Sequence, residues 1–311
     1  MKIFSGRSFI SGIGLVGLLF STPICAEESN ADTEDSSGWF KRIFSASGEY
    51  VAEETYVGEA SVRRSNQVVS DYSESDTVLR FVLTPRTQIG VLRLGAEWER
   101  FSFGFPDRTP LPNTLQSAAF VVGLDTQLSD SILIRVEAQP GIYGTNNMEG
   151  SDFNVPFLVG GTYIYNPNLQ IVVGVGVDVE RKIPVIPGAG IRWKIARLWV
   201  INAVLPAPRL EFQAARNLTL YAGGNFKETS FRVSDDFGNT HGGRSKLNRA
   251  ILDYSEVRTG VGADWKISPS LTLTGEVGYQ PYRSFDFYRP DVRFHEDGSA
   301  PYGMLSAHGA F

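Results

Sequence analysis

Apolar and polar residues alternate with a period of two along most of this chain. Between residues 169 and 179, one set of alternate positions holds Leu169, Ile171, Val173, Val175, Val177 and Val179. The positions between them include Gln170, Gly174 and Asp178, and residues 271–280 repeat the pattern. Successive side chains of a β-strand point to opposite faces, so this spacing predicts strands with one apolar and one polar face. No long segment has a comparable stripe at helical spacing.

The periodic runs are separated by connections that alternate between short and long. Short turns are expected at 84–87, 129–130, 166–168, 196–197, 216–217 and 268–270, and longer loops at 64–76, 104–113, 145–151, 180–184, 204–208, 234–250 and 286–300. Short turns at one end and long loops at the other are typical of bacterial outer-membrane barrels. The alternation predicts an all-β, transmembrane, antiparallel up-and-down barrel of about 14 strands with periplasmic termini. Pro206 and Pro208 weaken the strand assignment in 198–215, which leaves 12 strands as an alternative.

The polar faces of the expected strands carry charges of both signs. In a barrel these faces line the lumen and the apolar faces meet lipid. The candidate lumen-lining charges include Arg93, Glu97, Arg135, Glu137, Asp178, Arg192, Arg258, Asp264 and Glu276. Tryptophan and tyrosine at strand ends favour the barrel because interfacial aromatic residues form girdles there. A soluble β-protein with water on its polar faces is the alternative.

The N-terminus has the layout of a secretory signal peptide. Lys2 and Arg7 precede the apolar run 9–20, and Ala26 offers a cleavage site. Residues 1–26 are therefore expected to be removed on export to the outer membrane. Residues 27–44 are acidic and polar, as in a disordered linker, and 45–311 form the expected barrel. Cleavage after Ala26 removes the single cysteine, which excludes disulfides and cysteine chemistry from the mature chain.

Charge and the C-terminus indicate the partners. The formal net charge is −5 and no basic stripe is present, which argues against binding to nucleic acid. The terminal Phe311 resembles the assembly signal of outer-membrane barrels, although Gly303, Ala307 and Gly309 replace the larger apolar residues of such signals. We therefore expect contact with outer-membrane lipid and with the barrel-assembly machinery during biogenesis.

The most distinctive stretch is 181–222. It contains Ile183-Pro184-Val185-Ile186-Pro187 with Gly190 and Trp193, then Leu205-Pro206 with Pro208 and Leu210, then the run from Asn217 to Gly223. This arrangement resembles an uncharacterised family of bacterial outer-membrane β-barrels described as a domain of unknown function. Phe212 stands where the family pattern has tyrosine. The resemblance implies a barrel in the outer membrane and brings no catalytic residues with it.

Candidate chemistry outside the lumen is sparse. His241 and His295 fall in expected loops and His308 in the last strand, while Ser230, Ser234 or Ser245 could in principle serve as a nucleophile beside His241. No G-x-S-x-G motif selects one of these serines. Two acidic loop segments, 71–76 and the group Asp235, Asp236 and Asn239 around Gly238, offer oxygen ligands without the spacing of a calcium loop. We expect no catalytic, cofactor-binding or metal-binding residues.

The interior charges carry the functional hypothesis. The leading one is a non-enzymatic outer-membrane barrel that serves as a small passive or selective pore for small solutes or ions. The excess of acidic over basic groups in the lumen of such a pore would mildly favour the passage of cations over anions. The alternatives are a closed structural or surface-binding barrel, in which opposite charges bridge the lumen, and a lipid-modifying barrel enzyme. Residues 234–250 and 286–300 are long enough to fold inward and plug the lumen.

Overall fold

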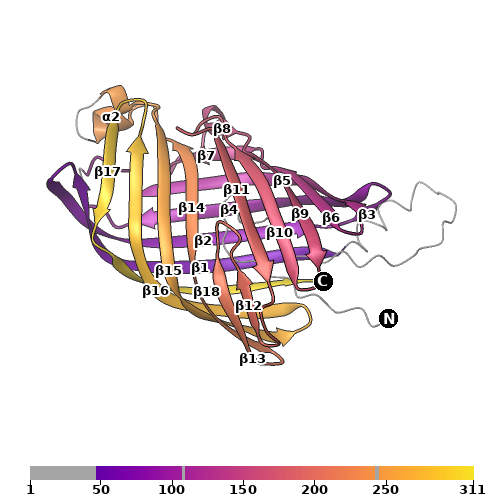
Figure 1. Cartoon of the computed structure of the whole chain (residues 1–311). Helices are drawn as coiled ribbons and strands as arrows, with labels where there is room; N and C mark the ends of the chain where they lie inside the picture. Colours follow the sequence, from indigo (N-terminus) through magenta and orange to yellow (C-terminus); the bar gives the residue numbers. More distant parts are fainter. Residues whose placement is uncertain (1–46, 107–108, 242–244) are drawn as a thin grey trace.

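The computed structural model describes residues 47–106, 109–241 and 245–311, and these form a closed antiparallel β-barrel (Figure 1). The expected signal peptide, 1–26, and the expected linker, 27–44, lie outside the described residues. Among the described residues, no helix is long and apolar enough to cross a membrane. The described part of the chain is nearly all-β, with one four-residue helix, α2 (Phe237–Thr240), and two short 3-10 turns.

The strands follow one another around the barrel wall. The first half consists of β1 (Gly48–Arg64), β2 (Gln67–Leu83), β3 (Arg86–Thr87), β4 (Gly90–Phe103), β5 (Thr114–Ser129), β6 (Ile132–Ala138), β7 (Gly141–Gly144), β8 (Phe153–Asn154) and β9 (Phe157–Asn166). The second half consists of β10 (Leu169–Val177), β11 (Val185–Trp193), β12 (Trp199–Asn202), β13 (Arg209–Ala215), β14 (Leu218–Arg232), β15 (Ile251–Ser268), β16 (Leu271–Phe287), β17 (Val292–Asp297) and β18 (Ala300–Ala310).

These strands occupy fourteen positions around the wall, which confirms the expected strand number. Some positions are shared: β6 and β7 both pair with β5, and β17 and β18 both lie between β16 and β1. The last strand pairs with the first from Glu49↔Ala310 to Val57↔Tyr302, and this ladder closes the barrel. Closure leaves no sheet edge along β1 or β18, as a wall exposed to lipid requires.

Most of the expected turns and loops are present, and two expected loops are not. The first, 64–76, is largely strand, because β1 and β2 continue past the barrel rim and turn at Ser65, whose φ is 55°. The second, 286–300, holds β17, which pairs with both β16 and β1. Polar residues dominate both segments, which hid their strands from a periodicity argument.

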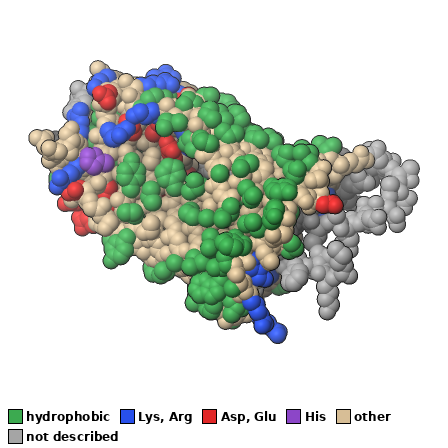
Figure 2. Space-filling model, viewed as in Figure 1, with side chains coloured by type: hydrophobic (Ala, Val, Ile, Leu, Met, Phe, Trp, Pro, Cys, Tyr) green, Lys and Arg blue, Asp and Glu red, His purple; other side chains and the backbone are tan. Residues whose placement is uncertain are grey.

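The outer wall is apolar around the middle of the barrel. Its exposed side chains include Leu79, Phe81, Leu94, Phe120, Val122, Ile171, Val173, Leu220, Val261, Val277 and Leu305. Figure 2 shows hydrophobic side chains over the body of the barrel on one of its faces, and charged side chains gathered at the end that carries α2. We call this end the loop end. The opposite end, where Gly48 bonds to Phe311, is the terminal end.

Gly278 of β16 allows two strands to approach closely. A Cβ added there would lie 2.1 Å from the Thr259 carbonyl oxygen of β15, and main chain cannot move aside as a side chain can. We expect Gly278→Ala to lower the free energy of unfolding by about 1–3 kcal/mol, the usual cost of overpacking. Urea unfolding in detergent micelles, followed by tryptophan fluorescence, measures this.

Gly303→Ala on the neighbouring strand β18 is the matched control. Nothing lies within 4 Å of a Cβ added at Gly303, so its unfolding free energy should stay within about 0.5 kcal/mol of the wild type. Equal effects of the two substitutions would show that the close approach at Gly278 does not limit stability.

Candidate functional site: the barrel interior

A first cluster of buried charges fills the lumen near the terminal end. We call it the terminal-end cluster; it consists of Glu49, Arg80, Arg93, Glu97, Asp125, Arg135 and Glu137. Glu137 is at its centre and accepts hydrogen bonds from Arg80 at 2.8 Å and from Arg93 at 3.0 Å. Arg93 also reaches Glu49 of β1 at 3.0 Å. Strands β1, β2, β4, β5 and β6 are therefore joined on their inner faces.

A second cluster crosses the middle of the lumen. This mid-barrel cluster consists of Glu74, Asp76, Glu99, Lys227, Glu256, Arg258, Arg283 and Glu296. Lys227 of β14 donates to Asp76 of β2 at 2.8 Å and to Glu99 of β4 at 2.7 Å. Their strands lie on different sides of the barrel, so these ion pairs span the lumen. In the mid-barrel cluster, three basic side chains contact five carboxyl groups.

An aromatic plug lies directly above this cluster, toward the loop end. It consists of Tyr72, Phe101, Phe103, Phe105, Phe231, Tyr254, Phe285, Phe287 and Phe294, each at most 6% exposed. Its rings meet at centroid distances such as 4.5 Å between Tyr72 and Phe105 and 5.2 Å between Phe103 and Phe285. Such pairs add stability beyond the burial of apolar area.

The plug and the mid-barrel cluster form one continuous filling. The Tyr254 hydroxyl lies within hydrogen-bond distance of both Glu74, at 2.9 Å, and Glu256, at 2.8 Å, and its single hydrogen bonds to one of them at a time. The Arg283 guanidinium lies 4.5 Å from the Tyr72 ring, and the Lys227 ammonium 4.8 Å from the Phe101 ring. These cation–π contacts join the polar layer to the apolar layer without a gap at their boundary.

The segment 234–250 closes the loop end over the plug. Phe237 of α2 stacks on Phe287 at a centroid distance of 5.9 Å, and Leu247 is fully buried in the same apolar core. Val292 and Phe294 of the segment 286–300 belong to this core as well. Both segments therefore place apolar side chains over or within the lumen.

The remaining expected lumen charges form smaller groups. Asp264 lies 3.6 Å from Arg209, and Arg192 lies 3.6 Å from Glu211. Glu276 accepts hydrogen bonds from the hydroxyls of Tyr221, at 2.5 Å, and Tyr302. Asp178 follows β10 and pairs with Arg181 at 3.3 Å.

All nine charges selected from the sequence thus lie inside the wall or, for Asp178, buried at its rim. The sequence analysis did not select several partners that make the clusters continuous: Glu49, Glu74, Asp76, Glu99, Asp125, Lys227, Glu256 and Arg283. The signal for Glu74 and Asp76 was present, since both lie at every second position before Val78 and Arg80. They were assigned to a loop with metal-binding potential, whereas the structure buries both against basic side chains.

The candidate histidines and serines do not come together. His241 shares a 2.8 Å hydrogen bond with Thr240 and stacks on Phe237. Ser230 donates to Asp253, and Ser234 to Asp236. His308 is buried on the inner wall, as expected from its strand position. Asp235 pairs with Arg249 at 3.2 Å, and the described residues contain no group of three or more metal-ligating side chains.

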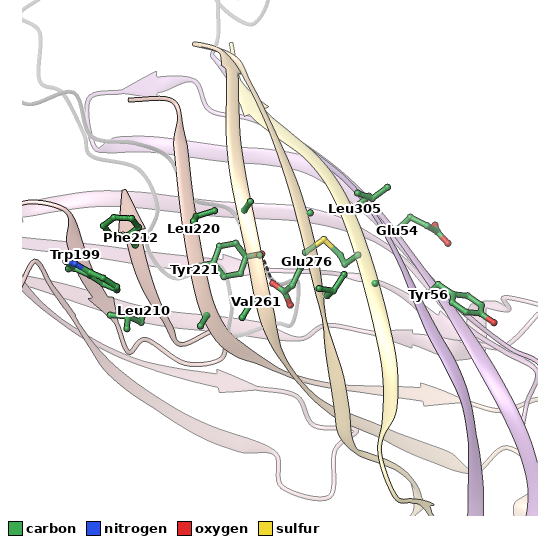
Figure 3. A pocket seen from close by; sticks show the side chains of 17 residues that line it. Glu54, Tyr56, Trp199, Leu210, Phe212, Leu220, Tyr221, Val261, Glu276 and Leu305 are labelled. Atoms are coloured by element: carbon green, nitrogen blue, oxygen red, sulfur yellow. Dashed lines mark hydrogen bonds between the residues drawn. The ribbon is translucent and has the colours of Figure 1, made fainter. Parts of the chain in front are cut away.

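The outer wall carries a shallow apolar groove of about 1000 Å³ (Figure 3). It extends from Glu54 and Tyr56 on β1 across β18, β16, β15 and β14 to Trp199 on β12. Gly275 and Gly303 contribute no side chains to it. The dashed line in Figure 3 is the hydrogen bond between Tyr221 and Glu276, two polar side chains among those that line the groove.

A closed barrel with an apolar outer wall and a charged interior defines the class of transmembrane β-barrels. Residues 44–294 match the profile of a family described as a domain of unknown function (DUF6268), and the chain belongs to this family. A search of curated proteins gives no match.

Solved structures with some likeness to the chain are also barrels of the outer membrane. The alignment with the toluene transporter TodX of P. putida covers 86% of this chain and 90% of the TodX chain, at 9% identity and a TM-score of 0.42. The alignment with the NanC porin covers 84% of this chain and 98% of the porin chain, at 10% identity and a TM-score of 0.39. The alignment with a FadL homologue of Pseudomonas aeruginosa covers 85% of this chain and 89% of the homologue, at 7% identity and a TM-score of 0.38.

Glu137 is the residue on which the terminal-end cluster depends. Its removal leaves the buried Arg80 and Arg93 guanidinium groups without their shared carboxylate. We expect Glu137→Ala to lower the free energy of unfolding by about 3–5 kcal/mol, the typical cost of breaking a buried ion pair. Asp297→Ala is the control, because its partner Arg63 is exposed and such pairs contribute about 0–1 kcal/mol. The free energies of unfolding are measured by urea titration. If the two variants lost similar amounts of free energy, the terminal-end cluster would not depend on Glu137.

Proposed function

We propose that this chain is a non-enzymatic outer-membrane barrel whose lumen is closed at rest, and which holds an ordered surface at the loop end. This is the closed structural or surface-binding barrel among the alternatives drawn from the sequence. The observation that supports it best is the continuous filling of the lumen by the mid-barrel cluster and the aromatic plug.

Physical reasons favour a lumen closed to hydrated solutes. The largest plug side chains are fully buried and touch one another, so a solute would have to separate aromatic rings to pass. It would also have to break ion pairs that are removed from water, which leaves unpaired buried charges. An opening therefore requires a rearrangement of the lumen and not a small motion of one side chain.

The membrane setting of the proposal follows from the wall. An apolar outer surface on a closed sheet suits a bilayer, and a cleavable signal peptide suits export to the bacterial outer membrane. In this orientation the terminal end faces the periplasm and α2 lies outside the cell. The proposed partners are outer-membrane lipid and, during biogenesis, the barrel-assembly machinery.

A small selective pore is the second candidate function, and the excess of carboxyl groups in the lumen favours it. The mid-barrel cluster has five carboxyl groups and three basic groups. Beside it lies a cavity of about 30 Å³, large enough for one or two water molecules, lined by Glu53, Asn225 and Arg258 among others. A pore of this kind would have to move the plug and would prefer cations.

Conductance in planar lipid bilayers separates the two candidates. The wild-type protein should insert without steady current steps, because the plug closes the lumen. The double variant Phe103→Ala/Phe285→Ala removes two rings that pack 5.2 Å apart, and it should produce steps that carry cations in preference to anions.

Phe120→Ala is the matched control, since this ring lies on the outer wall and is 67% exposed. It should be as silent as the wild type. Steady steps of equal size in the wild type and in the plug variant would overturn the closed barrel and support the pore. Heat-modifiable migration in SDS gels verifies that each protein is folded.

A further inference from the structure

The barrel wall has a discontinuity between β11 and β14. The strands between them, β12 and β13, are short and belong to the terminal half of the wall. The ladder from β11 to this hairpin ends near Ile191, whose carbonyl accepts from the Ala203 amide at 2.8 Å. The ladder from β14 ends at Phe226, whose amide donates to the Pro206 carbonyl at 2.9 Å. Above these points, residues 185–189 and 227–232 have no strand partner across the seam.

Proline removes backbone donors along this seam. Hydrogen bonds of β11 toward β12 come from odd-numbered residues, so the nitrogen of Pro187 faces the seam and carries no hydrogen. On the other side, Pro208 and Pro206 accept from the amides of Gly224 and Phe226 but return no hydrogen bond. Each of these two pairs keeps one bond where a regular ladder has two. The seam therefore has fewer backbone hydrogen bonds than a regular ladder of the same length.

A polar strap closes the seam at the loop end. The strap is the connection 178–184 between β10 and β11. Its Arg181 donates to the Glu228 carbonyl on the free edge of β14. Its Glu180 pairs with Arg232 at 2.7 Å, and its Lys182 pairs with Asp286 of β16 at 3.1 Å. Side chains here replace a missing backbone ladder, so the strap is easier to release than a strand pair.

Apolar side chains line the seam on both sides of the wall. Val185, Leu205 and Phe226 are exposed on the outer surface beside it. On the inner surface, Val204 packs against the buried pair Leu158 and Val172. The inner wall of β10 and β11 next to this group carries Gly174 and Gly188, which add no polar side chains there. Apolar side chains thus lie on both the outer and the inner surface of the wall beside the seam.

We propose that this seam is a lateral opening through which the acyl chain of a membrane lipid, or of a molecule that carries such a chain, enters the barrel from the bilayer. Release of the strap separates residues 185–189 from 227–232 and allows the singly bonded pairs Pro206–Phe226 and Pro208–Gly224 at the hairpin tip to part. The acyl chain then comes to lie against Leu158, Val172 and Val204. An acyl chain fits because both surfaces are apolar and because a chain makes no demand for hydrogen bonds in the opening. Entry through the seam does not require conduction along the lumen, because the seam lies in the wall beside the plug.

Photo-crosslinking from lipid tests the opening. The full-length protein is placed in nanodiscs of phosphatidylcholine with a diazirine near the end of one acyl chain, and crosslinked residues are identified by mass spectrometry. Crosslinks are expected at Val172 and Val204, inside the wall. The inward-facing, fully buried Val57 on the far side of the lumen defines the background, and the exposed Val261 verifies that the lipid reacts.

Two variants change the seam in opposite directions. Arg181→Ala/Lys182→Ala removes the contacts of the buried Arg181 and the half-exposed Lys182 from the strap. It should raise crosslinking at Val204 at least about fivefold, because an ion pair that is removed from water contributes more than an exposed one. Arg63→Ala removes an exposed ion pair with Asp297, away from the seam, and should leave crosslinking unchanged. Ala207→Cys/Asn225→Cys, in a Cys25→Ala background, places a disulfide between the tip of the hairpin and β14.

The locked variant should lose the crosslinks at Val172 and Val204 when oxidised and regain them on reduction. Its response to reductant shows whether the variant still folds, because a misfolded protein would not recover. Crosslinking at Val172 and Val204 that stays at the Val57 background in the wild type and in the strap variant would overturn the proposal. So would interior crosslinking that the disulfide does not reduce.

Discussion

The structure depends on the requirement that backbone groups in a lipid-facing wall find partners within the wall. A bilayer core offers no water to an unpaired amide or carbonyl, so a sheet that crosses it has to close on itself. The ladder between β1 and β18 meets this requirement and joins residues at opposite ends of the described chain. The same requirement explains why the seam between β11 and β14 is notable. There the wall replaces ladder bonds by proline, which lacks a donor, and by the Arg181 guanidinium.

Closure creates a second problem, which is how to fill the space inside. A fourteen-strand wall is wide enough to leave space that side chains must either fill or leave to water. This barrel fills it with long charged side chains in the middle and with aromatic rings toward the loop end. Buried ion pairs add little net stability compared with apolar packing, but removal of one partner is strongly destabilising because it leaves an unpaired buried charge. The interior is therefore filled by these side chains and sensitive to the loss of single residues.

The sequence alone predicted much of this architecture and little of the interior. Alternation over 169–179 placed Ile171 and Val173 outside and Asp178 inside, and the structure agrees. Alternation also selected interior charges such as Arg93 and Glu137 without showing which would meet. It misassigned Glu74 and Asp76 to a loop, because the strand there is polar on both faces and has no apolar signal. The aromatic plug was missed as a unit, since its rings come from six strands and a loop.

What the sequence determined by itself is the local geometry: strands with one apolar and one polar face, an even strand number, and a wall suited to lipid. These properties repeat every two residues and need no knowledge of distant partners. Only the tertiary structure decided that Lys227 meets Asp76 across 151 residues of chain, and that rings from β2, β4, β14, β15, β16 and β17 close the lumen. Such contacts follow from the curvature and register of the whole barrel, which bring opposite walls within reach of their side chains, and no local pattern encodes them.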